Sequence, residues 1–220
     1  MSNLTVFSNA GLPAVASLVT ALRSIQTEAG PSGVAILKMD KTGHWVFGAD
    51  QTEIEDDSLW AINPFSFVHG FIAWGEGEVL GEKMAPMGSP LPEMGIAPAG
   101  AARGWETQVG FSLKCINGED KGLEARYSAT SVGGKKAVIA AGLAIAEQVE
   151  ANEKSGAPQK PVAVVRLKKD HYQHKAYGRI YTPVFDVVEW MSMSGEPEAV
   201  EAGETPAAEA PTGRRRRRSV

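Results

Sequence analysis

The sequence predicts a mainly β protein with one or two helices, built as a single globular body over residues 1–194 and followed by a disordered tail over 195–220. Strand-forming segments recur along the body and are separated by glycine, proline and asparagine turns. The pair Asn117-Gly118 is the strongest hairpin signal in the chain. With 220 residues, of which 43% are hydrophobic, the chain is long enough for one substantial core.

The first predicted element is an amphipathic helix over about residues 12–28. Pro13 stands where a first helical turn tolerates proline, and Gly30-Pro31 ends the pattern. Apolar residues recur at helical spacing at Val15, Leu18, Val19, Leu22 and Ile25.

The middle of the chain is expected to be β structure. The predicted strands cover, in order, 34–39, 44–48, 65–74, 79–80, 105–116 and 123–130. The first two flank a four-residue turn at 40–43, and 105–116 pairs with 123–130 across Asn117-Gly118. Residues 85–104 hold four prolines and four glycines, a composition that predicts a long loop of the kind that is usually functional or mobile.

One longer helix and two strands complete the predicted body. Gly133-Gly134 opens a helix from about Lys135 to Asn152, which ends at Ser155-Gly156. Strands follow at 161–167 and 179–191, and Pro183 restricts the second to a sheet edge or a bulge.

The tail combines two charge patterns. Five glutamates alternate with proline, alanine and glycine, and five arginines follow; the residues are Glu196, Glu198, Glu201, Glu204, Glu209 and Arg214–Arg218. This composition cannot build a packed core, so the tail is predicted to be disordered.

Charge and cysteine content narrow the function classes. The net charge of −4 argues against a globally basic nucleic-acid binder, so such a role requires locally segregated charge. Residues 162–181 carry five basic side chains against Asp170, whereas acids collect at 50–57 and 76–82, which we interpret as solvated loops. Cys115 is the single cysteine, so an intramolecular disulfide is impossible and a cysteine-based zinc site is nearly excluded. We interpret Cys115 as a strand residue.

The sequence contains neither a membrane-spanning segment nor a secretion signal. No apolar run approaches the roughly 20 residues that a membrane span needs, and the N-terminus lacks the basic-then-apolar order of a signal peptide. A cytoplasmic protein without membrane contact is therefore expected.

Enzyme motifs are missing or incomplete. The stretch from Ser131 to Lys136 resembles a phosphate-binding loop, but Ala129 and Lys136 replace the glycine and the hydroxyl residue that this loop requires. We interpret it as a helix start with two exposed lysines. Asp170, His171 and His174 could share a metal ion, although a polar loop or strand edge is the simpler interpretation.

The remaining candidate alternates basic and aromatic side chains between residues 168 and 181. Unpaired bases stack on aromatic rings while phosphates need Lys and Arg along the same groove, so this alternation favours single-stranded nucleic acid. On a strand-loop-strand unit, these side chains can share one ridge. The competing interpretation makes Tyr177 and Tyr181 core or edge residues and the lysines a solvated face.

The predicted binding residues form two groups along the sequence. The first comprises Lys168, Lys169, His171, Tyr172, His174, Lys175, Tyr177, Arg179 and Tyr181. The second comprises Trp74, Arg103, Trp105, Lys135 and Lys136. No catalytic residue, metal ligand or cofactor is predicted.

The order of elements, with a helix before the last two strands, is similar to an OB-fold barrel, in which nucleic acid lies across the barrel face. The stretch from His174 to Phe185, HKAYGRIYTPVF, also resembles bacteriophage OB-fold single-stranded-DNA-binding proteins, and the likeness covers roughly residues 60–192. This resemblance implies sequence-independent protection of single strands during replication or recombination, and contact with replication proteins. The terminal arginines depart from the acidic tails of such proteins, which leaves partner recruitment through the tail open.

Three functions remain open at this point. The first is binding of single-stranded DNA without a cofactor and without catalysis, by a monomer or a homo-oligomer. The second is a viral structural or assembly protein that acts through protein contacts. The third is a metal-dependent nucleic-acid enzyme that uses Asp170, His171 and His174.

Overall fold

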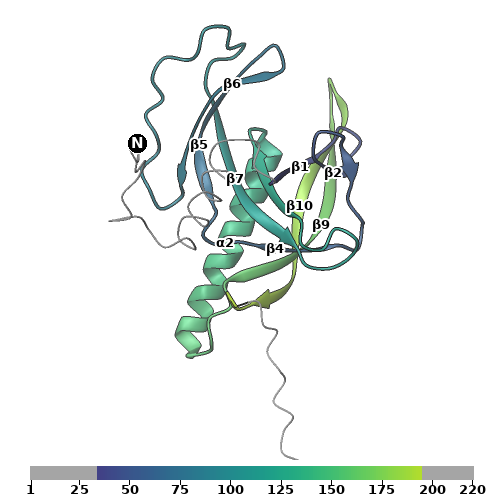
Figure 1. Cartoon of the computed structure of the whole chain (residues 1–220), viewed down its shortest axis with the longest axis vertical. Helices are drawn as coiled ribbons and strands as arrows, with labels where there is room; N and C mark the ends of the chain where they lie inside the picture. Colours follow the sequence, from purple (N-terminus) through teal and green to yellow (C-terminus); the bar gives the residue numbers. More distant parts are fainter. Residues whose placement is uncertain (1–33, 195–220) are drawn as a thin grey trace, which may run out of the picture.

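The computed structural model describes residues 34–194 (Figure 1). The predicted helix at 12–28 and the predicted tail at 195–220 lie outside the described residues. Ten strands and one helix, α2, make up the described part: β1 Ala35–Met39, β2 Trp45–Phe47, β3 Thr52–Glu53, β4 Leu59–Ile62, β5 Val68–Gly75, β6 Glu78–Pro86, β7 Glu106–Cys115, β8 Glu124–Ala129, α2 Val132–Ser155, β9 Val162–His174 and β10 Gly178–Met191.

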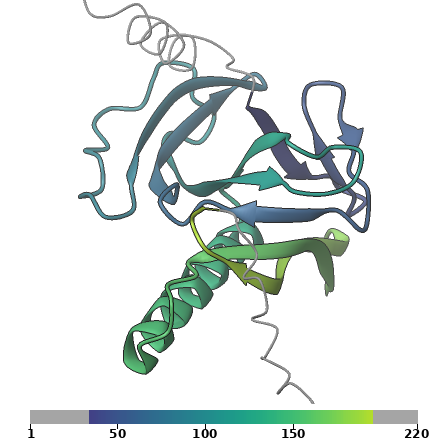
Figure 2. The ribbon, with the colours of Figure 1, turned by 60° about the horizontal axis from the view of Figure 1, so that its bottom comes forward.

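The strands form one strongly curled, open sheet, which confirms the mainly β, barrel-like prediction. The hydrogen-bonded order is β10-β9-β4-β7-β8-β1-β2-β3, and β5 pairs with both β6 and β7. Helix α2 connects β8 to β9, so it precedes the last two strands as expected. Figures 1 and 2 show the sheet curling around the N-terminal half of α2, while the C-terminal half of the helix extends past the strands.

The core fills the curl between the sheet and α2. Trp60 of β4, Phe111 of β7 and Val138 of α2 are fully buried there. In the described sheet, β10 and β8 are not joined by hydrogen bonds. The gap between these two strands is filled by aromatic rings instead. The ring of Phe185 on β10 lies 4.9 Å from that of Phe111 and 5.1 Å from that of Tyr127 on β8, centroid to centroid. Edge contacts of this kind stabilise beyond their buried area.

The connection between β7 and β8 is close to the prediction. The two strands pair as expected, and the predicted connection of residues 117–122 is one residue longer at each end, from 116 to 123. The amide oxygen of Asn117 accepts a hydrogen bond from the Leu59 N–H of β4. Asn117 therefore anchors β4 to this loop.

Several strand boundaries also differ. Strands β3 and β4 were not predicted, since segments of two and four residues are too short for a pattern. Strand β6 runs to Pro86, well beyond the predicted 79–80, and β9 runs to His174, so the basic segment is largely strand. Phe65 precedes β5 and is 78% exposed, whereas Pro183 lies in an edge strand, as predicted.

Candidate nucleic-acid interface

The first predicted group lies on the distal half of the β9–β10 hairpin. Pairing between β4 and β9 ends at Arg166, so the hairpin beyond it projects from the sheet, at the upper right of Figure 1. Three residues, 175–177, turn β9 into β10. The hairpin therefore presents two faces and a tip to its surroundings.

One face carries Lys169, His171, Arg179 and Tyr181. Tyr181 lies opposite His171 in the ladder, with ring centroids 6.1 Å apart. The Lys169 ammonium lies 5.4 Å from the centroid of the Tyr181 ring, a cation–π contact. This face combines the half-buried Tyr181 ring with the exposed cations Lys169 and Arg179, the residue types that single-strand binding uses.

The opposite face carries Lys168 and Tyr172. Lys168 forms an ion pair with Asp186 at 2.5 Å, which neutralises part of its charge. Tyr172 is 50% exposed and unshielded by a charged partner. Because successive side chains of a strand alternate between faces, Lys168 and Lys169 cannot share one ridge, and the single-ridge expectation is wrong.

At the tip, an exposed ring stands on a second ring. Tyr177 is 78% exposed and stacks on His174, with centroids 4.9 Å apart and an interplanar angle of 27°. The Nδ1 atom of His174 accepts a hydrogen bond from the Ala176 N–H, which orients the imidazole. Lys175 is exposed beside them. The tip thus holds a preoriented aromatic pair with a cation next to it.

A turn that the sequence analysis did not assign to the site supports this hairpin. A Cβ atom added at Gly43, between β1 and β2, would meet the Tyr181 ring at 2.7 Å, so the turn and the ring are in close contact. The Asp40 carboxylate accepts hydrogen bonds from the N–H groups of Thr42 and His44, both at 2.8 Å. The bond from the His44 N–H, followed by that from the Thr42 hydroxyl, holds the pKa of Asp40 below its ordinary value.

The N-terminus of α2 links the hairpin to the second predicted group. Gly133 packs against Thr182 of β10, because a Cβ atom there would lie 2.6 Å from the Thr182 methyl group. Two residues later, the Lys135 ammonium donates to the Thr107 hydroxyl of β7 at 2.8 Å. Lys136 is exposed on the same turn. Residues far apart in the sequence therefore meet at one end of the barrel.

Three further predicted residues lie beyond Thr107, around the loop that enters β7. Arg103 is exposed and pairs with Glu106 at 3.6 Å. Trp74 is 39% exposed, and its carbonyl accepts a hydrogen bond from the Ala102 N–H. The loop and the end of β5 are thus held together.

Trp105 is placed differently from a stacking residue. Its ring lies against Gly81, the Lys83 ammonium lies 5.3 Å from its centroid, and its indole nitrogen is buried without a hydrogen-bond partner. We interpret Trp105 as a structural residue beneath the loop.

Acidic residues lie against the base of the hairpin. A pocket of about 320 Å³ brings Glu53, Glu55 and Asp56 against Arg166 and the two lysines at 168 and 169. The acidic side chains of segment 50–57 in this pocket are exposed, as expected for a solvated loop, and they lie beside β9. The negative charge of these carboxylates stands beside the positive charge of Arg166 and of the two lysines at the hairpin base.

The metal-binding alternative is not supported by the arrangement of its residues. His171 faces Tyr181, whereas Asp170 lies on the opposite face of β9 and His174 packs against Tyr177. Within residues 34–194, no group of three or more His, Cys, Asp or Glu side chains is arranged to hold a metal ion.

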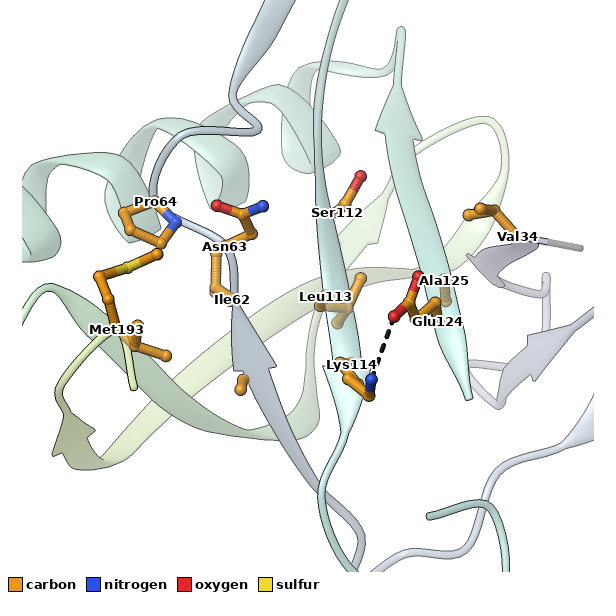
Figure 3. Close-up of a pocket in the computed structure, with 12 residues that line it drawn as sticks. Val34, Ile62, Asn63, Pro64, Ser112, Leu113, Lys114, Glu124, Ala125 and Met193 are labelled. Atoms are coloured by element: carbon orange, nitrogen blue, oxygen red, sulfur yellow. Dashed lines mark hydrogen bonds and ion pairs between the residues drawn. The ribbon is translucent and has the colours of Figure 1, made fainter. Parts of the chain in front are cut away.

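A second pocket, of about 280 Å³, lies away from all predicted binding residues (Figure 3). Strands β4, β7 and β8 form its floor, and Val34 and Met193 line its two ends. Its charged groups, Lys114 and Glu124, pair with each other at 3.1 Å. Because these two charges neutralise each other, the surface of the pocket is mainly apolar.

Comparisons with family models, curated proteins and solved structures found no match for this chain. In the described part of the chain, no helix is long and apolar enough to cross a membrane. The geometry of the hairpin and of the helix start is therefore what indicates a function.

Proposed function

We propose that this protein binds single-stranded DNA without sequence preference, using the distal β9–β10 hairpin and the N-terminus of α2. The observation that carries the proposal is the hairpin itself, which has exposed cations on both faces and at its tip, together with the exposed rings of Tyr172 and Tyr177. Rings stack on unpaired bases of any identity, while lysine and arginine contact the phosphates.

The contact between α2 and the sheet supports a longer binding path. Lys135 and Lys136 lie between the hairpin and the loop before β7, and the helix N-terminus adds partial positive charge. Strands β9 and β10 would then guide the DNA toward Arg103. This path avoids the acidic residues at the hairpin base.

On this proposal the protein is not an enzyme and needs no cofactor. It protects single strands during DNA replication or recombination in the cytoplasm, the host cytoplasm if the protein is viral. The resemblance to bacteriophage single-stranded-DNA-binding proteins supports this setting and suggests replication proteins as partners of the tail.

A second function, assembly through protein contacts, is favoured by a different surface. In the loop 87–104, Leu91 is 50%, Met94 47% and Ile96 98% exposed, which is unusual for apolar side chains without a partner. Such a surface fits a viral structural or assembly protein better than a DNA groove.

A binding experiment separates these functions. Fluorescence anisotropy with labelled oligothymidine and with a duplex of equal length, each with and without EDTA, measures affinity and metal dependence. Preference for the single strand that is insensitive to EDTA supports the proposal. Absence of binding to either DNA favours the assembly function, and EDTA-sensitive cleavage would point to the metal-dependent enzyme.

A further inference from the structure

Helix α2 carries an exposed apolar stripe on the side opposite the core. Ile139 is 52% and Leu143 58% exposed, and the two lie one turn apart. The other side of the same turns is buried through Val138, Ala141 and Ile145. A helix that is apolar on two opposite sides normally has a packing partner on each, and the sheet supplies only one of them.

Charges of opposite sign flank the stripe at its two ends. Lys136 precedes Ile139 by three residues, which is about one turn. At the other end, Glu147 follows Leu143 by four residues. Both charged side chains are exposed, and neither forms an ion pair within residues 34–194. The order along the stripe is therefore a cation, two apolar side chains and an anion.

This order is complementary to itself when a second copy of the helix runs antiparallel. A two-fold axis midway between Ile139 and Leu143 brings Ile139 against the partner's Leu143, and symmetry forms the reverse contact. Lys136 lies five residues before that midpoint and Glu147 six residues after it, so the two reach nearly the same level across the axis. At about 100° per residue, both are rotated to the same side of Leu143, by about 20° and about 40°. A two-fold axis keeps that side, so the opposite charges meet.

We propose that this protein forms a symmetric dimer in which α2 packs antiparallel on α2 of a second copy. Ile139 and Leu143 form the centre of the contact, and Lys136 pairs with the partner's Glu147 at both ends. Antiparallel helix dipoles add to the attraction, because each positively polarised N-terminus lies beside a negatively polarised C-terminal half. The C-terminal half of α2 extends past the strands, which leaves it accessible to a second helix (Figures 1 and 2).

The dimer goes beyond the proposed DNA binding and does not depend on it. In the dimer the Lys136 ammonium faces a carboxylate, which reduces its charge toward DNA. Lys135 instead donates to the Thr107 hydroxyl of β7 and lies outside the contact, so it stays available to the DNA path.

Cysteine cross-linking of the full chain tests the contact and its direction. Ala140 is exposed and one residue from the midpoint, so Ala140→Cys places two thiols on either side of the axis, where mild oxidation should join them. Ala151→Cys is the matched control, because antiparallel packing separates its two thiols by about 30 Å along the helices, and it should stay monomeric on a denaturing gel. The native Cys115 is 1% exposed and does not compete.

Charge reversal identifies the ion pair. Lys136→Glu should raise the dissociation constant of the dimer roughly tenfold, since it replaces two attractions by two repulsions, and Glu147→Lys should do the same. The double variant Lys136→Glu with Glu147→Lys should dimerise as the wild type does. The two positions are about 16 Å apart within one helix, so this restoration requires a second copy. Sedimentation velocity without DNA measures each dissociation constant, and circular dichroism confirms that each variant stays folded.

Different results would overturn the proposal. A monomer mass at the highest soluble concentration would remove the dimer, whether the introduced thiol at position 140 reacts rapidly or is shielded by another part of its own chain. Equal cross-linking of Ala140→Cys and Ala151→Cys would exclude the antiparallel arrangement. A dimer that is weakened by each single reversal and not restored by the double variant would exclude the Lys136–Glu147 pair.

Discussion

At the scale of single residues, the environment of each ring distinguishes binding from packing roles. Tyr177 exposes most of its surface and Tyr172 exposes half. By contrast, Trp105 lies beneath a loop and Tyr127 is 95% buried. Of the competing interpretation of Tyr177 as a core or edge residue, the core half is wrong, because 78% of the residue is exposed, whereas the edge half stays open. Tyr181 is intermediate: it packs on the turn at Gly43 while facing Lys169.

The exposed rings lead to the first prediction. Tyr172→Ala and Tyr177→Ala should each weaken binding of oligothymidine by roughly 1 to 3 kcal/mol, since each removes a stacking surface. Their melting temperatures should stay close to that of the wild type, because neither ring is buried. The matched control is Phe65→Ala, which removes an equally exposed ring away from the hairpin. Unchanged affinity in both tyrosine variants would remove the hairpin from the site.

A second prediction concerns the charges. Lys175→Ala and Arg179→Ala should each lower the slope of log affinity against log salt by about 0.7, the single-strand counterion contribution of one phosphate contact. Lys168→Ala should lower it less, because Asp186 already neutralises that lysine. Lys114→Ala is the control of equal charge on another surface. Equal slopes in Lys175→Ala and Lys114→Ala would contradict the proposed path.

A third prediction follows from the buried phenol of Tyr127. Burial raises its pKa in the folded protein far above the ordinary value. Below about pH 10 both states keep the proton, so stability is unaffected; above it, the unfolded state loses the proton first. The free energy of unfolding should therefore fall as pH rises past about 10, by up to roughly 1.4 kcal/mol per pH unit. Urea unfolding should show a shallower fall in Tyr127→Phe, and identical curves would contradict the assignment.

At the scale of elements, two glycines allow neighbouring strands of the curled sheet to approach each other closely. A Cβ atom at Gly70 of β5 would lie 1.9 Å from the Lys83 carbonyl oxygen of β6, and one at Gly110 of β7 would lie 2.4 Å from the Tyr127 carbonyl oxygen of β8. Glu82 of β6 can then reach across the sheet to Gln108 and Arg126, at 2.6 Å each. This close approach of the strands therefore requires glycine at positions 70 and 110.

The fourth prediction tests this dependence. Gly70→Ala should destabilise the protein by about 1 to 3 kcal/mol or more, because the added Cβ meets the backbone of Lys83, which cannot relax by rotating a side chain. Gly88→Ala is the matched control, since its position has open space and does not need a positive φ. Chemical denaturation measures both. Equal stability of the two variants would show that the β5–β6 hairpin shifts without cost.

At the scale of the whole molecule, basic and acidic residues occupy separate regions. The net charge is −4, yet the distal hairpin and the start of α2 gather cations, while Glu53, Glu55 and Asp56 face the hairpin base. An acidic protein can therefore offer a local path for a polyanion.

The fifth prediction concerns the tail in the context of the whole chain. Truncation after Met193 should leave the melting temperature nearly unchanged, because a segment of this composition cannot offset the entropy of ordering it. Differential scanning calorimetry of the truncated and full chains measures the effect. A drop of several degrees would show that the tail packs on the body.

The sequence by itself determined the elements whose signals are local. Strand alternation, the Ser131 cap whose hydroxyl accepts from the Gly134 N–H, the helix end at Gly156 and the edge position of Pro183 all depend on neighbouring residues. It also located the basic and aromatic segment, because composition and order are visible without a fold. The positions of the N-terminal helix and of the tail stay predictions.

Tertiary structure decided which of these residues come together. It paired Lys168 with Asp186 and Lys169 with the Tyr181 ring, joined Lys135 to Thr107, turned Asn117 toward β4 and set the acidic segment beside β9. Each of these outcomes depends on strand register or on contacts between residues distant in sequence. A local pattern specifies the period of an element, but the partner that an element meets is chosen by the packing of the whole core.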